Sequence, residues 1–288
     1  MVTDDASHRV ESKVSQAHSA RRNSGFIAWP TILLLVLALC VWSVNLWALI
    51  TGLMPIALGA LVTILSGYIS FTPFHEATHG NISGKSKNHI LDKTVGWLGG
   101  IPFWAPFTSF VLVHLTHHSN TNDPEKDPDY WVFSRNKLEV ALRCLSVYPN
   151  YLKHIFYLIP KRGHKVGIIQ IQMVLYLSVV ATAVAYGFHS GWGWEILLGW
   201  VAPGFITHGL LSWTLDFLPH FPHEDRTRYG QTRVLRGPGL RVLLLGQDLH
   251  IIHHMFPMVP FYRYKNVFEE IEPALREHNI RETALIGD

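Results

Sequence analysis

Charged side chains are scarce in this sequence. Asp, Glu, Lys and Arg make up 16% of the 288 residues, while 48% are hydrophobic. Soluble domains carry about 25% charged residues, so the composition argues against a soluble globular protein. The two cysteines, Cys40 and Cys144, are too few for a disulfide framework or a thiolate metal site. Any metal must therefore be held by nitrogen and oxygen ligands.

The apolar residues are concentrated in four long runs. Because a helix rises 1.5 Å per residue, each run is long enough to cross a hydrocarbon core of about 30 Å. The sequence therefore predicts an all-α integral membrane protein with four transmembrane helices. A fifth apolar stretch, residues 91–114, is broken by glycine and proline, so we expect it to lie in the interface or to re-enter under a cover of protein. The expected spans are residues 26–50, 53–71, 166–188 and 194–218.

The basic residues predict the orientation of these spans. All 24 Lys and Arg lie before the first span, between the second and third, or after the fourth, and the two short connections hold none. By the positive-inside tendency, both termini and the large middle segment face the cytoplasm. The net charge of +3 thus reflects topology, and no nucleic-acid partner is expected. The expected parts are a mobile cytoplasmic N-terminus (1–25), a membrane domain (26–270) and a C-terminal tail (271–288).

Histidines form clusters on the predicted cytoplasmic side. Residues three or four apart point from one face of a helix, so each cluster can offer several nitrogen ligands to one site. The acidic loop that follows the second cluster, residues 119–131, is dense in turn formers and is expected to lie in water. The clusters are "HEATH" (His75, His79), "HLTHH" (His114, His117, His118), "LPHFPH" (His220, His223) and "HIIHH" (His250, His253, His254).

The first cluster allows two interpretations. His75, Glu76 and His79 match the zinc-hydrolase pattern of two ligands and a general base, which makes an intramembrane zinc hydrolase the remote alternative. A catalytic zinc takes only three protein ligands, and this interpretation leaves at least six clustered histidines without a role. Eight or nine imidazoles suit two metals, and imidazole suits iron. Glu76 then accepts a hydrogen bond from a ligand ring.

The three boxes between four spans resemble the membrane fatty-acid desaturase and hydroxylase superfamily. Within it, the chain is most similar to desaturase-like beta-carotene hydroxylases. "HLTHHSNTNDPEKDPD" from His114, "LDFLPHFPHEDR" from Leu215 and "GQDLHIIHHMFPMVPFYRYKN" from Gly246 carry this resemblance. It implies a cytoplasmic histidine-box cap that holds two iron ions, with O2 as co-substrate. By position, the implied ligands are His75, His79, His114, His117, His118, His220, His250, His253 and His254, with Asp216, Glu76 and His223 as further ligands or their supports.

The resemblance also implies an activity and its partners. The first expectation is hydroxylation of the beta-ionone ring of beta-carotene-type carotenoids. The alternative is a fatty-acyl desaturase or hydroxylase, because the Gly80 that follows His79 is closer to fatty-acyl desaturases. In either case the substrate is an apolar lipid within the membrane. A ferredoxin or an NAD(P)H-dependent reductase chain is expected to supply the electrons.

Overall fold

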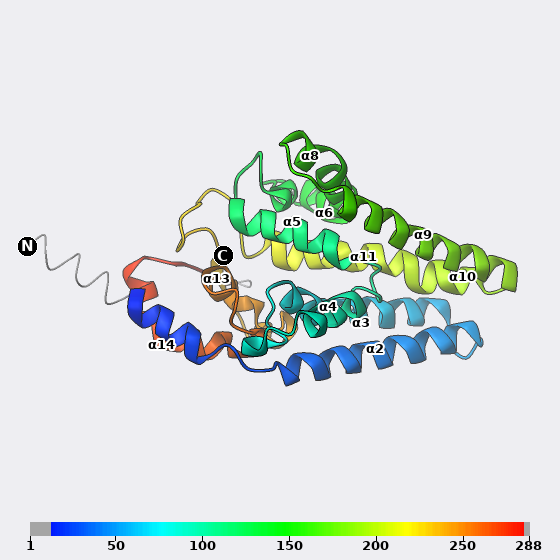
Figure 1. Ribbon diagram of the computed structural model, residues 1–288, viewed down its shortest axis with the longest axis horizontal. Helices are drawn as coiled ribbons and strands as arrows, with labels where there is room; N and C mark the ends of the chain where they lie inside the picture. Colours follow the sequence, from blue (N-terminus) through cyan, green and yellow to red (C-terminus); the bar gives the residue numbers. More distant parts are fainter. Residues whose placement is uncertain (1–12, 285–288) are drawn as a thin grey trace, which may run out of the picture.

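The computed structural model describes residues 13–284 and contains four helices long and apolar enough to cross a membrane. They run side by side along the long axis of the molecule, α2 beside α3 and α9 beside α10 (Figure 1). One such helix lies at each of the four segments expected to span the membrane. α3 continues beyond the expected end at residue 71, which brings His75 into the helix. The bounds are Trp29–Ile50 (α2), Ile56–Thr78 (α3), Gly167–Ser190 (α9) and Gly193–Phe217 for the fourth.

The fourth span is not a uniform helix. It consists of α10 (Gly193–Ile196), η4 (Leu197–Val201), α11 (Ala202–Leu211) and η5 (Ser212–Phe217), of which η4 and η5 are π-helical. Pro203 has no N–H to donate to the carbonyl of Gly199. That carbonyl instead accepts a 2.6 Å hydrogen bond from the Thr63 hydroxyl on α3. Because the proline leaves this carbonyl without its usual helical donor, the hydroxyl of Thr63 can link the fourth span to the second.

The apolar stretch between the second and third spans re-enters the helical bundle. Its two helices are joined by a turn, residues 100–106, that lies against the fourth span. The Trp104 indole donates to the carbonyl of Val201 at 2.9 Å, and the Trp200 indole donates to that of Ile101 at 3.0 Å. Side chains thus take the place of water for this irregular backbone. The helices are His89–Gly99 (α4) and Phe107–Asn120 (α5).

Shorter elements cover one end of the four spans. The fold is mostly helical, as predicted, apart from one parallel strand pair in the described residues, in which Arg233 lies opposite Arg281. These strands were not predicted because each has only four residues. Between spans two and three lie η1 (Gly84–Ser86), η2 (Pro128–Val132), α6 (Lys137–Leu145), α7 (Val147–Lys153), η3 (His154–Leu158) and α8 (Ile159–Lys161). After the fourth come β1 (Arg233–Arg236), α12 (Leu240–Leu243), η6 (Gln247–Leu249), α13 (His250–Met255), η7 (Phe261–Arg263), α14 (Tyr264–Glu277) and β2 (Arg281–Ala284).

Both terminal segments pack on this covering layer. Residues 13–22, part of the segment expected to be mobile, are helical, and Arg22 pairs with Glu270 of α14 at 2.8 Å. Residues 1–12 of that segment lie outside the described residues. Helix α14 runs across the expected boundary at residue 270, and β2 extends further into the expected tail.

Helix α13 shows how the core presents the histidines. Ile251 and Ile252 are fully buried against the apolar face of α14. Since residues three and four apart share a face, this anchoring turns His250, His253 and His254 to the opposite side. The short helix is therefore held by its isoleucines, and its histidines point into the molecule.

Candidate metal centre

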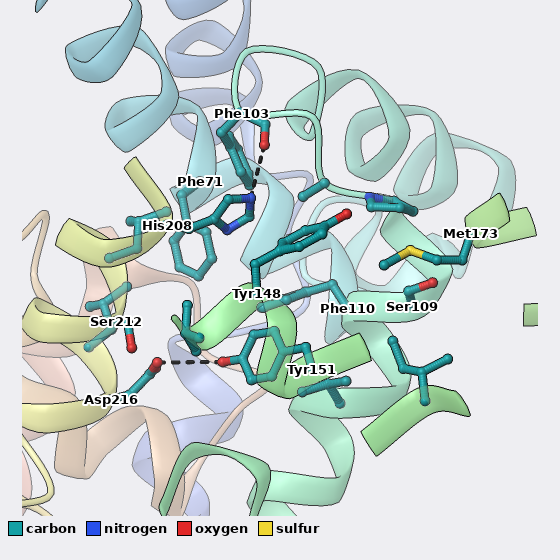
Figure 2. Close-up of a pocket in the computed structure, with 17 residues that line it drawn as sticks. Phe71, Phe103, Ser109, Phe110, Tyr148, Tyr151, Met173, His208, Ser212 and Asp216 are labelled. Carbon is teal, nitrogen blue, oxygen red and sulfur yellow. Dashed lines mark hydrogen bonds between the residues drawn. The ribbon is translucent and has the colours of Figure 1, made fainter. Parts of the chain in front are cut away.

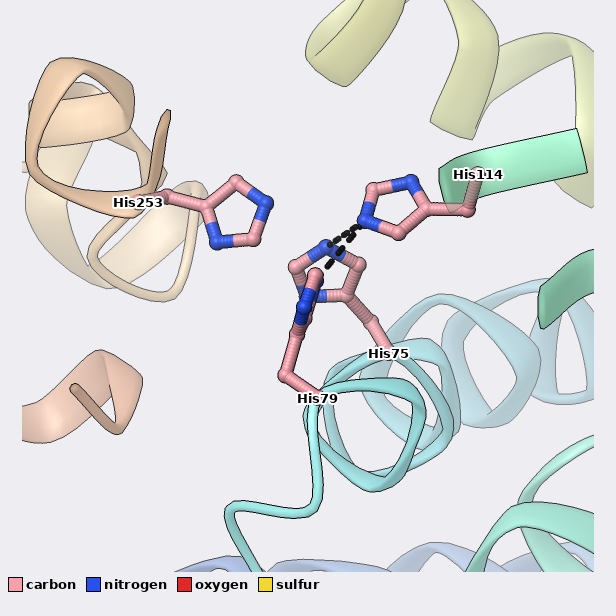
Figure 3. Close-up of side chains that lie close together, drawn as sticks. All are labelled: His75, His79, His114 and His253. Atoms are coloured by element: carbon pink, nitrogen blue, oxygen red, sulfur yellow. Dashed lines mark hydrogen bonds between the residues drawn. The ribbon is translucent and has the colours of Figure 1, made fainter. Parts of the chain in front are cut away.

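All nine histidines expected as ligands converge where the spans meet the covering layer. His75 and His79 come from the end of α3, the second box from the last turns of α5, and the third from α13. Figure 3 shows His75, His79, His114 and His253 pointing toward one another from these three elements. The ligand atoms of these four lie within 4.8 Å of one another, as do those of the sets His117, His220, His254 and His118, His253, His254.

The first group centres on His114. Its Nε2 lies 3.0 Å from Nε2 of His75, 2.9 Å from that of His79 and 3.0 Å from that of His118. The Nε2 of His118 is in turn 2.8 Å from that of His253. The ring nitrogens of three separate chain segments therefore face one small volume.

A second group lies beside the first. The Nε2 of His254 is 3.3 Å from that of His117 and 3.1 Å from that of His250. The ring of His220 packs edge-on against those of His117 and His254, with 4.8 Å between centroids in each case. The Nε2 of His220 is buried and has no hydrogen-bond partner. This is expected of a ring nitrogen that would bind a metal ion.

Hydrogen bonds alone cannot account for this packing. A neutral imidazole nitrogen either donates one hydrogen bond or accepts one, so the Nε2 of His114 satisfies at most one of its three neighbours. Metal–imidazole bonds of about 2.0–2.1 Å place adjacent ligand nitrogens about 3 Å apart, which matches the separations found here. The residues present therefore fit a metal held by imidazole nitrogen.

Burial keeps most of these rings in the neutral form that a metal requires. Burial lowers the pKa of His79 to about 4 and that of His250 to about 3. The pKa values of His114, His118 and His254 are well below the ordinary value, first because of burial and then because of neighbouring histidines. Near neutral pH, one nitrogen of each of these rings therefore has a lone pair that a metal ion can bind.

The outer nitrogens are held by groups that sequence reasoning missed. The Nδ1 of His117 lies 2.8 Å from Oδ1 of Asp127 and 3.3 Å from Oδ2 of Asp129. Burial by itself lowers the pKa of His117, but these two carboxylates outweigh it and raise the value to about 9. Both aspartates are buried, so the expectation that this loop lies in water was wrong for them, while residues 124–126 are exposed as expected. Asp127 also accepts hydrogen bonds from the backbone N–H groups of Asn122 and Asp129, and Asp129 accepts one from the Tyr151 hydroxyl, so the ring and these donors together compensate the two acids for the loss of water.

Three other rings have outer partners. The Nδ1 of His250 donates to Oε1 of Gln247 at 2.7 Å, and that of His220 donates to the carbonyl of Gln231 at 3.1 Å. The Tyr264 hydroxyl lies 3.2 Å from Nδ1 of His253. Such partners fix the orientation of ligand rings. Gln247 and Tyr264 lie in the segment from Gly246 that carries the family resemblance, but the sequence assigned them no role.

Three further expected residues lie beside the two groups. Glu76 is fully buried, and neither of its carboxylate oxygens has a hydrogen-bond partner. The Nε2 of His223 bonds to the backbone carbonyl of Asp216 at 3.2 Å, and burial lowers the pKa of this ring to about 4. The side chain of Asp216 turns toward Tyr151 (Figure 2). None of the three belongs to the metal-binding sets among the described residues.

A largely apolar cavity leads to the histidines. It holds about 580 Å³ of space between atoms, part of it open to the outside. Figure 2 shows it bounded by Phe71, Phe110, Tyr148 and Met173. A smaller space continues from it and is lined by His75, His114, His117 and His250. Six residues line both spaces, namely Phe71, Phe110, Val113, Tyr151, Leu215 and Asp216.

Comparison with known proteins gives the family. The fatty acid desaturase model matches residues 47–285. The chain belongs to the fatty acid desaturase family. Membership of this family supports an oxidoreductase activity. Together with the four apolar helices, it also indicates an integral membrane protein.

Characterised desaturase relatives are distant. A fatty acid desaturase of Bacillus subtilis (strain 168) is 26% identical over 243 residues, covering 74% of this chain and 68% of the relative. A ferredoxin-type sn-1 acyl-lipid omega-3 desaturase of Synechocystis is 26% identical over 246 residues, 72% of this chain and 65% of the relative. A fatty acid conjugase of Calendula officinalis is 23% identical over 252 residues, 71% and 64% of the two chains. The chain thus spans about two thirds of the length of these relatives.

Proposed function

We propose that the chain is an oxygen-dependent oxidoreductase with two iron ions that removes hydrogen from an unactivated carbon of a lipid. The observation that carries this proposal is the Nε2 of His114, which faces three other imidazole nitrogens within 3.0 Å. A second histidine group beside it supports a second ion. The residues that would hold the two ions are His75, His79, His114, His117, His118, His220, His250, His253 and His254.

Two iron ions with O2 and two electrons would supply an oxidant able to remove hydrogen from an aliphatic carbon. The chain contributes the positioning and the protection. The cavity that runs past Phe110 and Leu215 directs one carbon toward the histidines. Its apolar walls exclude water from that point. Asp127 and Asp129 hold the ring of His117 in one orientation.

An acyl chain is the substrate that the comparisons favour. The relatives described above are named for fatty acids or acyl lipids, and one for ferredoxin. We therefore propose an acyl lipid as substrate and a ferredoxin, or an NAD(P)H-dependent reductase chain, as electron donor. Ring hydroxylation of a carotenoid stays a prediction that rests on the motifs alone. The basic residues support a site on the cytoplasmic side.

Metal content separates this proposal from the zinc-hydrolase alternative. The full chain, purified anaerobically in detergent, is expected to hold about two iron ions, whereas a zinc hydrolase would hold about one zinc. His253→Ala should lose iron and all oxidation. His189→Ala, an exposed histidine at the end of α9, is the matched control and should keep both.

Product analysis tests the reaction. Cells that express the chain with a ferredoxin and its reductase should accumulate unsaturated or hydroxylated acyl chains, measured by gas chromatography and mass spectrometry. Parallel expression in cells that make beta-carotene tests the carotenoid prediction by liquid chromatography. A content of one zinc ion per chain, together with no oxygen-dependent product in either host, would contradict the proposal.

A further inference from the structure

A second space, the outer groove, lies on the side of α5 that faces away from the substrate cavity. It is formed by α5, which lies beside α9 (Figure 1), and by the segment that runs from α8 into α9, and it holds about 1370 Å³ of space between atoms, part of it open to the outside. Leu112 and Leu115 line it from one face of α5, whereas Phe110 and Val113 line the cavity from another. In the part of the chain that the structure describes, no residue lines both the outer groove and the cavity or the space beside the histidines. Helix α5 therefore separates the outer groove from the metal centre.

The lining of the outer groove changes from apolar to polar along α5. It is aliphatic at Leu112 and Leu115 and polar at Thr116, Ser119 and Asn120. The helix rises about 12 Å from Leu112 to Asn120. One wall of the groove thus offers an apolar length followed by a polar end.

The other wall changes in the same sense where the third span begins. That span starts at Gly167, so Ile169 lies within it, while Arg162 and His164 come before it. The boundary between hydrocarbon and lipid headgroups therefore crosses the outer groove. Its apolar part is at the depth of acyl chains, and its polar part is at the depth of phosphates.

The polar end carries positive charge, and no acidic side chain lines it in the described residues. Lys126 and His164 form no ion pair within residues 13–284. The Arg162 guanidinium donates to the carbonyl of Glu125, which holds it next to Lys126 and uses one of its five N–H groups. The Asp123 carboxylate in the same loop is already paired with an arginine at 2.7 Å. The end of the groove is thus suited to an anion.

One class of molecule matches both parts of the outer groove. The phosphate of a phospholipid accepts hydrogen bonds from guanidinium, ammonium and imidazole groups, and its acyl chain fits the aliphatic part. Basic pockets beside membrane helices bind lipid headgroups in this way. A zwitterionic phospholipid would bring a cation to the same basic end, so a phospholipid of net negative charge fits better.

We propose that the outer groove binds one phospholipid of net negative charge. Its phosphate lies at Lys126, Arg162 and His164, and an acyl chain runs along the aliphatic part. Because α5 separates this lipid from the histidines, it is bound without being oxidised. The site is additional to the proposed function and does not depend on it.

Such a lipid would brace the helix that carries the second histidine box. At the inner end of the outer groove the Thr108 hydroxyl joins α5 to α9 by a 2.7 Å hydrogen bond to Gln172. Toward the outer end the groove itself separates α5 from the segment between α8 and α9. A lipid that fills this gap connects the two segments where the protein alone leaves space between them.

Native mass spectrometry of the full chain in detergent tests the site by counting bound lipids. The probes are dioleoyl phosphatidylglycerol, dioleoyl phosphatidylcholine, oleate and glycerol phosphate. We expect one phosphatidylglycerol per chain to bind roughly 10-fold more tightly than phosphatidylcholine, because its net charge is attracted by the basic end. Equal binding of the two phospholipids overturns the proposal. Binding of oleate or glycerol phosphate as tight as that of phosphatidylglycerol also overturns it, because the site would then recognise any fatty anion or a soluble phosphate.

Variants at the polar end show whether the named side chains are responsible. Lys126→Gln combined with Arg162→Gln should bring the preference for phosphatidylglycerol close to one. Lys137→Gln removes the same charge from α6, where the side chain is exposed and lines no part of the outer groove, and should keep the preference. A preference that survives the double substitution overturns the proposal.

A second pair of variants tests the apolar part independently. Ile169→Trp places an indole inside the outer groove and should remove the bound phosphatidylglycerol. Ile168→Trp changes the neighbouring residue, which is 74% exposed and does not line the groove, and should keep it. Equal lipid binding in these two variants places the lipid elsewhere and overturns the proposal.

This site and the proposed function fail in different ways. A chain that binds phosphatidylglycerol in the outer groove and oxidises nothing supports the lipid site and removes the proposed function. Ile169→Trp is expected to keep turnover, because the outer groove and the cavity share no lining residue. Loss of turnover in Ile169→Trp but not in Ile168→Trp would make the outer groove part of the substrate route and overturn the assignment of an unreacted lipid.

Discussion

Asp127 accepts a 2.8 Å hydrogen bond from Nδ1 of His117, and both side chains are almost fully buried. Because the carboxylate holds the proton on Nδ1, the ring would offer its Nε2, which faces the second histidine group, to a metal ion. Loss of such a partner usually costs 10- to 100-fold in metal affinity or activity.

Asp127→Ala should therefore lower iron affinity or turnover roughly 10- to 100-fold, measured by chelator competition and product formation. Glu125→Gln, in the same loop but exposed, is the matched control and should match the parent chain. Full iron retention and full turnover in Asp127→Ala would show that Asp129 supports the ring alone.

Acid should destabilise the metal-free chain. Burial lowers the pKa of His79 and of His223 to about 4 and that of His250 to about 3, whereas an unfolded histidine titrates near 6.5. Between these values the unfolded chain binds more protons, so the free energy of unfolding falls as the pH drops. This contribution is complete above about pH 6.5 and is lost progressively toward pH 4.

Thermal unfolding of chelator-treated protein in detergent, from pH 7.5 to 5, measures this dependence. His223→Gln removes one titrating ring that belongs to neither histidine group, so it should make the decline shallower. An unfolding midpoint that stays constant or rises on acidification contradicts the assignment of neutral buried rings.

Filling the narrow part of the cavity should block turnover and spare the metal. Leu215 lines both the main cavity and the space beside the histidines, so Leu215→Trp places an indole where the substrate must pass. Turnover should fall about 100-fold, since displacement of a reacting carbon by about 1 Å is already that costly, and iron content should not change. Leu198→Trp, on the exposed surface of the same span, should leave both unchanged, and equal losses in the two variants would argue against the proposed route.

The contact between the re-entrant turn and the fourth span should be sensitive to one methyl group. A Cβ at Gly204 would overlap the Trp104 indole nitrogen, so Gly204→Ala should destabilise the chain by roughly 1–3 kcal/mol. Gly167→Ala, where a Cβ meets only open space, is the control in a thermal unfolding assay. Adding Trp104→Leu to Gly204→Ala should recover part of the loss, and no recovery would place the strain elsewhere.

Sequence patterns predicted the spans and the histidine boxes because each depends on local spacing. Hydropathy over about 20 residues marks a span, and intervals of three and four place His114, His117 and His118 on one helix face. The role of Asp127 and Asp129 was missed because it depends on a partner. The same acids in a turn-rich loop face water unless a buried ring nitrogen needs them, and the sequence does not record that pairing.

The cavity was equally beyond sequence reasoning. Its walls come from α3, α5, α7, α9 and the fourth span, and single residues such as Tyr151 and Met173 meet there only through packing. Asp216 was expected as a ligand or its support from its place four residues before His220. The π-helical turn η5 and the following Pro219 break the α-helical spacing on which such counting relies.

The π-helical turn η5 determines which amino-acid changes the fourth span can accept. An α-helix rotates about 100° per residue, and the extra residue of a π turn shifts the rotational phase of everything after it. The lipid-facing side of residues 193–211 and the site-facing positions beyond Ser212 are therefore set independently of each other. The extra residue held by η5 thus lets His220 meet His117 while residues 193–211 keep their lipid-facing side. Substitutions along this span can accumulate freely on its outer face, whereas its length in residues is fixed by the site at its end.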